Sequence, residues 1–296
     1  MAEALRAAHP GLEVEVVAVK TRGDADRRPF ASIGGKGLFV AEVERAVVEG
    51  TADLAVHSAK DLTAQLAPEC SILCVPPRAS AHDVVVGGAG ESGGERLGAL
   101  RPGAVVGTSS MRRRALLAEA RPDLDVVELR GNLDTRLRKV EDGVVDAAIL
   151  AAAGLERLGV EAGAGLDPEW WVPAPGQGAL AIEARTDRVD LRALLAPLND
   201  DVAAGELACE RAFSARLEGG CSVPLGCLAR TENGRVTATG YLGNPGGEQG
   251  LRDRISGPLT AAAELGCELA NALYDAGGRD ILDELRTVEP TAPSAP

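Results

Sequence analysis

The sequence predicts an α/β protein in which two hinged lobes, with mostly parallel or mixed sheets, are followed by an α+β domain. Hydrophobic residues make up 45% of the 296 residues but aromatic residues only 2%, so the cores must consist of valine, leucine, isoleucine and alanine. This composition is typical of buried strands covered by helices. Apolar stretches suited to strands alternate with helical stretches between residues 83 and 160, which indicates an open, mostly parallel sheet. A chain of this length is expected to form two or three domains.

The first lobe is expected to run from the start of the chain to the stiff connector Pro76-Pro77-Arg78. Proline fixes the backbone and cannot extend a strand ladder, so this connector can serve as a hinge. A glycine-rich stretch in the lobe suits a lid that carries Lys36, although an ordinary surface loop fits the local sequence equally well. The expected elements are a helix at 2–8, a strand at 13–19, an irregular loop at 20–35, a helix at 38–49 and strands at 53–57 and 70–75.

The second lobe is expected between two proline-rich connectors. The connector PAPGQG at 173–178 precedes a strand at 179–183, which we expect to cross back to the first lobe. The first domain is therefore predicted to comprise 1–77 with 179–197, and the second domain 83–173. The expected elements of the second domain are strands at 83–86, 104–106, 125–129 and 144–150, helices at 111–120, 133–141 and 151–158, and a loose glycine-rich stretch at 87–98.

A third domain with a different pattern is predicted over residues 200–288. Its strands are not separated by helices, which favours an α+β arrangement. The last residues, 289–296, contain the proline-rich tail PTAPSAP and are expected to be disordered. The expected elements are a helix at 200–217, strands at 226–231, 235–242 and 251–256, and helices at about 260–276 and 279–286.

Charge and cysteine content exclude several classes of function. A net charge of −13 argues against a nucleic-acid partner, because phosphate binding needs a basic field. The six cysteines form no C-x-x-C pair and the three histidines are scattered, so a zinc site is not expected. No secretory signal or membrane-spanning run is present. We expect a cytoplasmic protein with reduced thiols, no metal and no membrane partner.

Arginines nevertheless cluster within this acidic chain. Arg112, Arg113 and Arg114 are consecutive, and Arg130 and Arg136 follow closely. Such a local basic patch suggests a small polyanionic ligand, because guanidinium groups bind carboxylates in pairs of hydrogen bonds. A solvated helix face with acidic neighbours is an equally valid interpretation of the same residues.

Two strand exits carry candidate anion-binding residues. Ser58-Ala59-Lys60-Asp61 follows a short apolar strand, and ligands bind beyond the carboxyl ends of such strands. The alternative is that Ser58 or Asp61 merely caps a helix. The stretch Gly107-Thr108-Ser109-Ser110 lies between a predicted strand and a clear helix, where backbone N–H groups and hydroxyls favour an anion.

Cys221 follows two glycines and precedes Pro224 by three residues. Glycine permits backbone angles that other residues avoid, and proline interrupts regular structure, so Cys221 is expected on a shaped turn. The alternative is a small buried core residue. Local spacing alone leaves both open.

Six motifs in order resemble the porphobilinogen deaminase family, also called hydroxymethylbilane synthases, over about residues 5–286. The motifs are GGKGLF at 34–39, AVHSAKD at 55–61, GTSSMRR at 107–113, LRGNLDTRL at 129–137, PAPGQGAL at 173–180 and RLEGGCSVPLG at 216–226. The resemblance implies a three-domain transferase whose first two domains are similar to periplasmic binding proteins. It implies that four porphobilinogen molecules are joined head to tail with release of ammonia, on a covalent dipyrromethane primer.

The resemblance also implies roles for individual residues. Asp61 matches the catalytic aspartate, whose carboxylate would stabilise positive charge on a pyrrole nitrogen as ammonia leaves. Cys221 matches the cysteine that holds dipyrromethane through a thioether, and Lys36 and Phe39 fall in the lid motif. The residues implied to bind the carboxylates of the cofactor and growing polypyrrole are Ser58, Lys60, Thr108, Ser109, Ser110, Arg112, Arg113, Arg130, Gly131, Asn132 and Arg136.

The chain departs from the family pattern at three places. Ser32 stands where the family often has lysine, and Thr63 where it often has proline. The family usually opens with an R-x-S-x-L-A strand, and this sequence begins at the following helix. We therefore expect a gap or an unpaired edge in the first sheet, and lower stability and activity than in a chain extended upstream.

Two other classes of function remain open at this level. A non-catalytic, two-lobed protein that binds a small anion would share the architecture, but it would not need Cys221. A cysteine-nucleophile hydrolase would need a histidine partner in a recognisable triad, and none is evident. The transferase is the favoured prediction, acting as a monomer on porphobilinogen.

Overall fold

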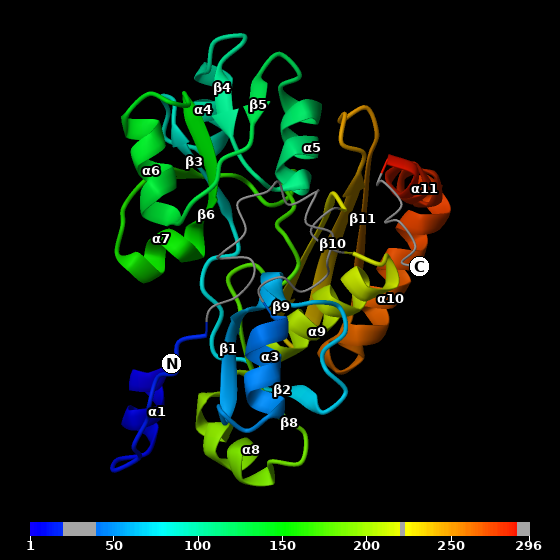
Figure 1. Ribbon diagram of the computed structural model, residues 1–296. Helices are drawn as coiled ribbons and strands as arrows, with labels where there is room; N and C mark the ends of the chain where they lie inside the picture. Colours follow the sequence, from blue (N-terminus) through cyan, green and yellow to red (C-terminus); the bar gives the residue numbers. More distant parts are fainter. Residues whose placement is uncertain (20–39, 220–222, 289–296) are drawn as a thin grey trace, which may run out of the picture.

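The computed structural model describes residues 1–19, 40–219 and 223–288. It contains three sheets, each with its own helices, and the second sheet lies above the first in the view of Figure 1. The α/β fold class predicted from the sequence, with two lobes and an α+β third part, is confirmed. The placement of the lobe boundaries stays a prediction.

The first sheet is built from three strands in the order β1-β8-β2. β1 is Leu54–Ser58, β2 is Cys70–Cys74 and β8 is Leu180–Arg185. The strand that follows the second connector thus lies between two strands from the first 77 residues. All its described pairings are antiparallel.

Four helical segments accompany the first sheet. They are α1 (Ala2–Ala8), α3 (Ala41–Val48), α8 (Val189–Leu195) and the short 3₁₀ turn η3 (Ala196–Leu198). Leu5 of α1 joins Leu191 and Leu195 of α8 in the core under Ile182. The helix predicted at 2–8 is therefore formed, and the burial of Leu5 stabilises it against the first core.

The strand predicted at 13–19 is not formed among the described residues. Leu12 and Val14 pack beside the first core, but Val16 and Val17 are 76% and 51% exposed. An alternating valine pattern makes a strand only when a neighbouring strand accepts its hydrogen bonds. This segment has no such ladder.

The second sheet has the strand order β5-β4-β6-β3-β7 and is mixed. β4 pairs in parallel with β5 and β6, whereas β3 is antiparallel to both its neighbours. A mixed sheet was among the arrangements predicted for the lobes, and this pairing confirms it. The strands are β3 (Asp83–Gly87), β4 (Val105–Gly107), β5 (Asp125–Val127), β6 (Ala147–Ala151) and β7 (Ala164–Gly165).

The helices of this lobe are α4 (Gly93–Ala99), α5 (Met111–Ala120), α6 (Leu133–Glu141) and α7 (Ala152–Leu158). α4 corrects the prediction of a loose stretch at 87–98. Ser92 and Glu95 form a reciprocal capping box at its start, and this pattern was obscured by the surrounding glycines. A Cβ atom on Gly93 would lie 2.7 Å from the Gly165 carbonyl oxygen, so glycine lets this helix approach β7 closely.

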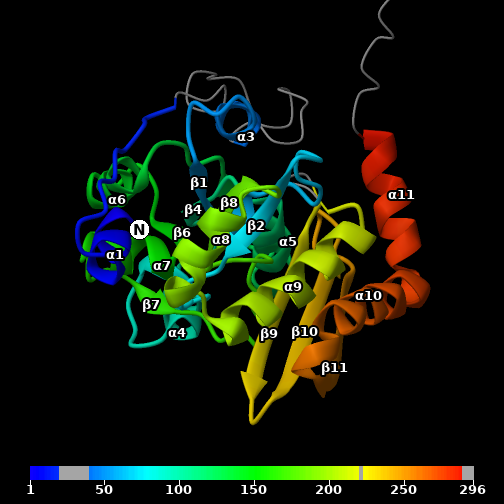
Figure 2. The same ribbon diagram turned by 90° about the horizontal axis from the view of Figure 1, so that it is seen from below.

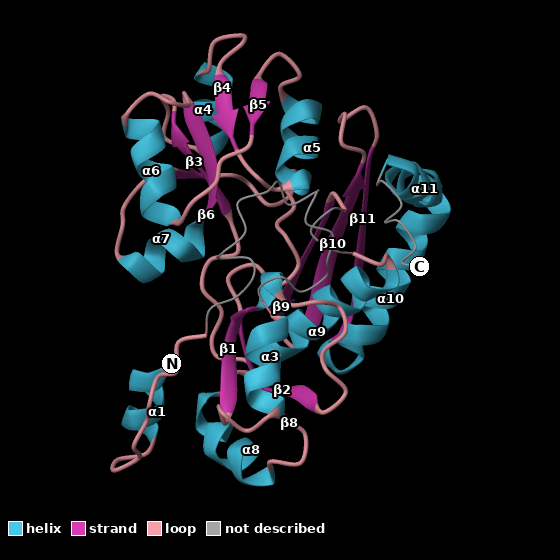
Figure 3. Ribbon diagram, viewed as in Figure 1, coloured by secondary structure: helices cyan, strands magenta, loops and turns pink. Residues whose placement is uncertain are grey.

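The third sheet is an antiparallel meander of β9 (Leu225–Glu232), β10 (Arg235–Gly243) and β11 (Gly250–Pro258). Its elements agree with the prediction within a few residues. Two long helices, α9 (Asp201–Arg216) and α10 (Ala262–Leu273), pack together against it, as Figure 2 shows from below. The 3₁₀ turn η4 (Leu259–Ala261) precedes α10, and the π-turn η5 (Tyr274–Gly278) joins α10 to α11 (Arg279–Val288). Figure 3 shows this segregation of strands and helices in the third domain.

Helix α9 belongs to two cores at once. Cys209, Phe213 and Leu217 face the third sheet. Ala203 and Leu207 instead contact a cluster of the first lobe that includes Ala59, Val75, Ala179 and Ala181. The helix that leads to the Cys221 segment is therefore packed directly against the lobe that carries Asp61.

Candidate active site

Lys60 and Asp61 lie on a single 3₁₀ turn, Ala59–Asp61, at the carboxyl end of β1. The Ala59 N–H donates to the carbonyl of Ala179, the residue before β8, at 3.0 Å, which fastens this turn to the edge of the sheet. Ser58 occupies the N-cap position but forms no side-chain cap. Both Lys60 and Asp61 are exposed, so the turn presents a cation and an anion side by side.

The PAPGQG connector supports this turn from behind. Gly176 has a φ of +74°, and a Cβ atom there would lie 2.8 Å from the Ala59 carbonyl carbon and 2.9 Å from the Lys60 nitrogen. Only glycine allows this close approach without displacing the turn. The Gly176 N–H donates to Glu210 of α9 at 2.6 Å, so α9 also fixes the connector.

Thr108, Ser109 and Ser110 link β4 to α5. Ser110 is the N-cap of α5, and its hydroxyl accepts the Arg113 N–H at 3.4 Å. The Thr108 hydroxyl accepts the Ser110 N–H at 3.2 Å, whereas the Ser109 hydroxyl donates to the Leu129 carbonyl at 2.8 Å. A hydroxyl that accepts a bond still has its proton to donate. Thr108 and Ser110 can therefore offer donors to an anion.

Arg112 and Arg113 are 3% and 6% exposed and converge on Asp83, which is fully buried at the start of β3. Each arginine donates one terminal N–H to this carboxylate at 2.7 Å. Their other terminal groups donate to the Val172 and Ile149 carbonyls. The part of each guanidinium available to a ligand is thus smaller than the sequence suggested, but both Nε atoms are buried and have no partner among the described residues.

Asp83 accepts four hydrogen bonds, two on each oxygen. Trp171 Nε1 donates to Oδ2 and Gln177 Nε2 donates to Oδ1, both at 2.8 Å, beside the two arginines. Burial alone would raise the pKa of Asp83, but Arg112 and Arg113 outweigh it and hold the pKa far below its usual value. Sequence reasoning missed Asp83, whose only signal is a charged residue at the start of an apolar strand.

Arg130, Gly131 and Asn132 lie just beyond β5. Asn132 caps α6 by accepting the Thr135 N–H at 3.0 Å, and Gly131 has a φ of +115° with Thr135 packed where a Cβ would be. Arg130 donates to Glu128 at 2.8 Å. Gly131 and Asn132 therefore shape the loop, and the Gly131 carbonyl accepts Arg136 Nε at 2.8 Å.

Charge interactions connect four of the predicted site residues, which are Lys60, Asp61, Arg113 and Arg136. Burial lowers the pKa of Lys60, which Asp61 raises and Arg113 lowers further. Burial and then Arg113 lower the pKa of Arg136, while Asp61 raises it. Lys60 itself remains exposed. Positive charge is crowded here, and an anionic ligand would relieve the repulsion.

Three predicted site residues, Lys36, Phe39 and Cys221, lie outside the described residues. The segment before Cys221 is described as far as Gly219. Glu218 has a φ of +52°, and a Cβ on Gly219 would lie 2.4 Å from a Leu225 methyl group. The turn out of α9 thus uses left-handed backbone and close packing, as expected for a shaped turn.

Four of the other cysteines are unsuitable as attachment points. All four are buried. Burial raises the pKa of Cys70 and Cys74 to about 11 and that of Cys209 to about 12, and it also raises the pKa of Cys227. A thiol must ionise to act as a nucleophile, so these groups are poorly reactive. Cys267 is half-buried on α10.

The two connectors between the lobes meet at Glu210, another residue that sequence reasoning missed. Arg78 donates to both of its carboxylate oxygens, at 2.7 and 3.0 Å, and also to the Gln177 carbonyl. Glu210 is fully buried and accepts the Ala229 N–H of β9 as well. One carboxylate therefore joins both connectors to the third domain.

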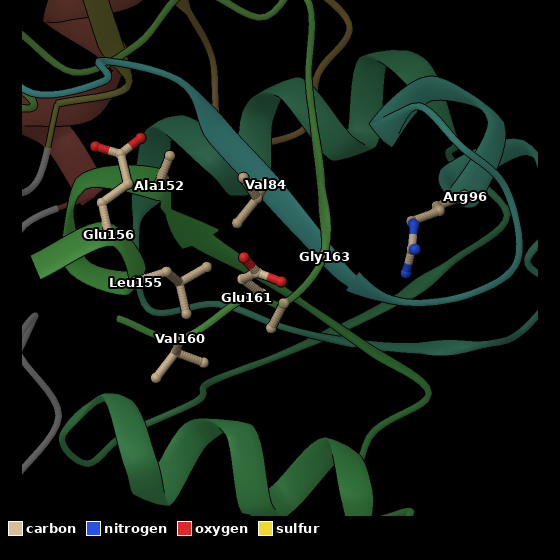
Figure 4. Close-up of a pocket in the computed structure, with 9 residues that line it drawn as sticks. Val84, Arg96, Ala152, Leu155, Glu156, Val160, Glu161 and Gly163 are labelled. Atoms are coloured by element: carbon tan, nitrogen blue, oxygen red, sulfur yellow. The ribbon is translucent and has the colours of Figure 1, made fainter. Parts of the chain in front are cut away.

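Two surface hollows lie apart from the predicted site residues. One, of about 440 Å³, is on the second lobe and is lined by Arg96, Glu156, Glu161 and apolar neighbours (Figure 4). The other, of about 500 Å³, lies between residues 64–72 and Arg211. Within 1–19, 40–219 and 223–288, no group of three metal-binding side chains occurs. In the same part of the chain, no helix is long and apolar enough to cross a membrane.

Comparisons with known proteins decide the family. Residues 1–193 match the family model "Porphobilinogen deaminase, dipyromethane cofactor binding domain", and residues 204–275 match "Porphobilinogen deaminase, C-terminal domain". This chain belongs to the porphobilinogen deaminase family. Porphobilinogen deaminases of Roseiflexus sp. (strain RS-1) and Roseiflexus castenholzii are each 47% identical to it over 283 residues, covering 95% of this chain and 92% of theirs. A periplasmic VFT2 domain of Bordetella pertussis BvgS is 17% identical over 71% of this chain and 79% of its own, with a TM-score of 0.37.

Membership confirms the predicted enzyme class. The chain is a hydroxymethylbilane synthase, a transferase of tetrapyrrole biosynthesis with a dipyrromethane cofactor. The described residues suit this cofactor, whose acetate and propionate groups need cationic and hydroxyl donors. Lys60, Arg136, Thr108, Ser110 and the unpartnered Nε atoms of Arg112 and Arg113 supply such donors.

Proposed function

We propose that the crowded positive charge around Lys60, Arg113 and Arg136 binds the carboxylates of the dipyrromethane cofactor and the growing polypyrrole. The observation that supports this is the placement of the three side chains, with Lys60 on the turn after β1 and Arg113 and Arg136 on the helices that follow β4 and β5. Burial together with Arg113 lowers the pKa of both Lys60 and Arg136, in keeping with crowded positive charge. Guanidinium and ammonium groups held close together gain stability from an anionic ligand. Ser58, Ser109, Arg112, Arg130, Gly131 and Asn132 are proposed to complete the binding surface.

Asp61 is proposed as the catalytic residue. Its exposed carboxylate lies beside Lys60 on a turn fixed by β8 and the PAPGQG connector. A carboxylate held opposite a pyrrole N–H stabilises the positive charge that develops on the ring as ammonia leaves. Because the turn is held before the substrate binds, little reorganisation is needed during reaction.

Cys221 is proposed as the thioether attachment point, and Lys36 and Phe39 as lid residues over the substrate. Support for Cys221 comes from its place in the RLEGGC motif and from the poor reactivity of the four buried thiols. The bound dipyrromethane supplies a primer to which each porphobilinogen is joined. Tethering makes every coupling partly intramolecular, which raises the effective concentration. A cytoplasmic monomer without nucleic-acid partners completes the proposal.

The test is the variant Asp61→Asn, which keeps the shape of the side chain but removes its charge. We expect the cofactor to remain bound, as measured by intact mass, and kcat for hydroxymethylbilane formation to fall on the order of 100-fold or more. Asp275→Asn, an exposed position in the third domain, is the matched control. A near-normal kcat in Asp61→Asn would refute the assigned role.

A further inference from the structure

The segment that follows Asp61 has little internal support. Residues 62–69 contain no helix or strand. The Leu62 N–H donates to the Ala59 carbonyl at 3.3 Å, the Cys70 N–H donates to the Ala67 carbonyl at 2.9 Å, and the Thr63 hydroxyl donates to the Gln65 carbonyl. Asp61 therefore lies at the start of a loop whose shape depends on contacts from elsewhere.

Two side chains from other elements hold this loop. Glu44 of α3 accepts the Ala67 N–H at 3.1 Å. Arg211 of α9 donates to the Ala64 carbonyl at 3.2 Å. Ala64 is only three residues after Asp61, so the arginine holds the end of the loop nearer to the reacting carboxylate.

The position of Arg211 on α9 follows from helical geometry. Residues four apart lie on one face of a helix, so Arg211 continues the stripe formed by Ala203 and Leu207. Those two residues pack against the first lobe. Five residues after Arg211 the helix ends, and the chain enters the segment that contains Cys221. Arg211 therefore connects the loop after Asp61 to the helix that leads towards the proposed cofactor attachment.

The hydrogen bond crosses an opening rather than a packed interface. Arg211 and the residues 64–68 face each other across the hollow of about 500 Å³. Apolar packing holds Leu62 and Ala67 near the two ends of the loop, so the Arg211 bond acts on the stretch between them. Burial lowers the pKa of the Arg211 guanidinium, which only Glu183 raises. In the described part of the chain Arg211 has no ion-pair partner, and its side chain donates its hydrogen bond to the loop.

We propose that Arg211 is a positioning residue for the transferase reaction, because it anchors the loop that follows Asp61 to α9, the helix that precedes the segment containing Cys221. This inference rests on the proposed role of Asp61. A small displacement of a reacting group lowers the rate of the chemical step more than it weakens binding. The signature of the role is a loss in kcat with little change in KM or cofactor loading.

The principal variant is Arg211→Met, which keeps much of the side-chain volume and removes the donor. We expect a full complement of cofactor by intact mass, a KM within about threefold of wild type, and a fall in kcat of roughly 10- to 100-fold. Arg211→Lys, which keeps the charge and one donor direction, should retain an intermediate kcat. Arg192→Met, at an exposed position on α8, is the control and should behave as wild type.

A rescue variant tests the loop directly. Leu62 has φ −67° and ψ 143°, the conformation that a residue before proline prefers. Thr63→Pro removes the Thr63–Gln65 hydrogen bond but should stiffen the loop, and should restore part of the kcat lost in Arg211→Met. Hydrogen exchange gives a second readout: amides of 62–70 should exchange faster in Arg211→Met, while those of β9, β10 and β11 stay protected. General destabilisation would instead speed exchange in the third sheet.

The outcomes separate this inference from the function it rests on. A kcat within twofold of wild type in Arg211→Met, or unchanged exchange at 62–70, overturns the anchoring role. A kcat loss that neither Arg211→Lys nor Thr63→Pro relieves also overturns it. If Asp61→Asn retains its kcat, the proposed role of Asp61 fails, whereas the exchange measurement still decides whether Arg211 anchors the loop. If Arg211→Met does not fold, the kcat of Arg211→Lys and the hydrogen exchange of its residues 62–70 decide whether Arg211 anchors the loop.

Discussion

Replacing Asp83 with asparagine should strongly lower the free energy of unfolding of the second lobe, although the two side chains have nearly the same shape. Each carboxylate oxygen of Asp83 accepts two N–H groups: Oδ2 from Arg112 and Trp171, and Oδ1 from Arg113 and Gln177. An amide presents one acceptor and one donor. In either orientation its NH₂ group would face two donors, one of them from an arginine.

The magnitude follows from burial. Asp83 is fully buried and both arginine side chains are at most 7% exposed, so solvent cannot compensate for the lost charge. Removing one member of a buried ion pair costs about 3–5 kcal/mol, because an uncompensated charge is left inside the protein. For a lobe of this size we expect Tm to fall by roughly 10 °C or more.

Urea and thermal unfolding of Asp83→Asn, followed by circular dichroism, measure this loss. Asp125→Asn, at an exposed position on β5, is the control and should change stability by about 0.5 kcal/mol or less. Because the folded-state pKa of Asp83 lies far below its unfolded value, its stabilisation is complete above about pH 5. The difference in free energy of unfolding between wild type and Asp83→Asn should shrink as the pH falls below about 4. A Tm within 1 °C of wild type at pH 7 would refute the reasoning.

Two further predictions concern the attachment point and Lys60. Cys221→Ser should have the mass of the bare polypeptide, whereas the control Cys267→Ser should retain the pyrrole adduct; an adduct on Cys221→Ser would contradict the assignment. In this cofactor-free Cys221→Ser background, the lowered pKa of Lys60 means that the unfolded chain binds the additional proton, so stability should rise as the pH increases towards about 10.4. Adding Lys60→Met to this background should flatten the rise of the urea midpoint between pH 8 and 10. If the midpoint rises with the same slope with and without Lys60→Met, the lowered pKa of Lys60 is refuted.

Local patterns were sufficient to predict most elements of the fold. Ser110 before a helix, Asn132 before the next helix and Asp200 before α9 all cap the helices that they precede. These signals act over three or four residues, so they can be read without knowing the fold. The strand expected at 13–19 is wrong for the opposite reason, since a strand needs a partner that its own sequence does not contain. The helix α4 was missed because its capping box lies among glycines.

The candidate site divides in the same way. Lys60, Asp61 and the Thr108–Ser110 loop could be proposed from the sequence because each directly follows a strand, where ligands tend to bind. By contrast, Asp83 meets Arg112, Trp171 and Gln177 only after the chain has folded, and Glu210 meets Arg78 across 132 residues. Such contacts leave no local pattern, because the energy of a buried charge depends on partners brought from distant parts of the chain. The sequence by itself predicted which residues carry the chemistry, while the tertiary structure decided which buried groups lie behind them, because only folding brings Asp83 and Glu210 to their distant partners.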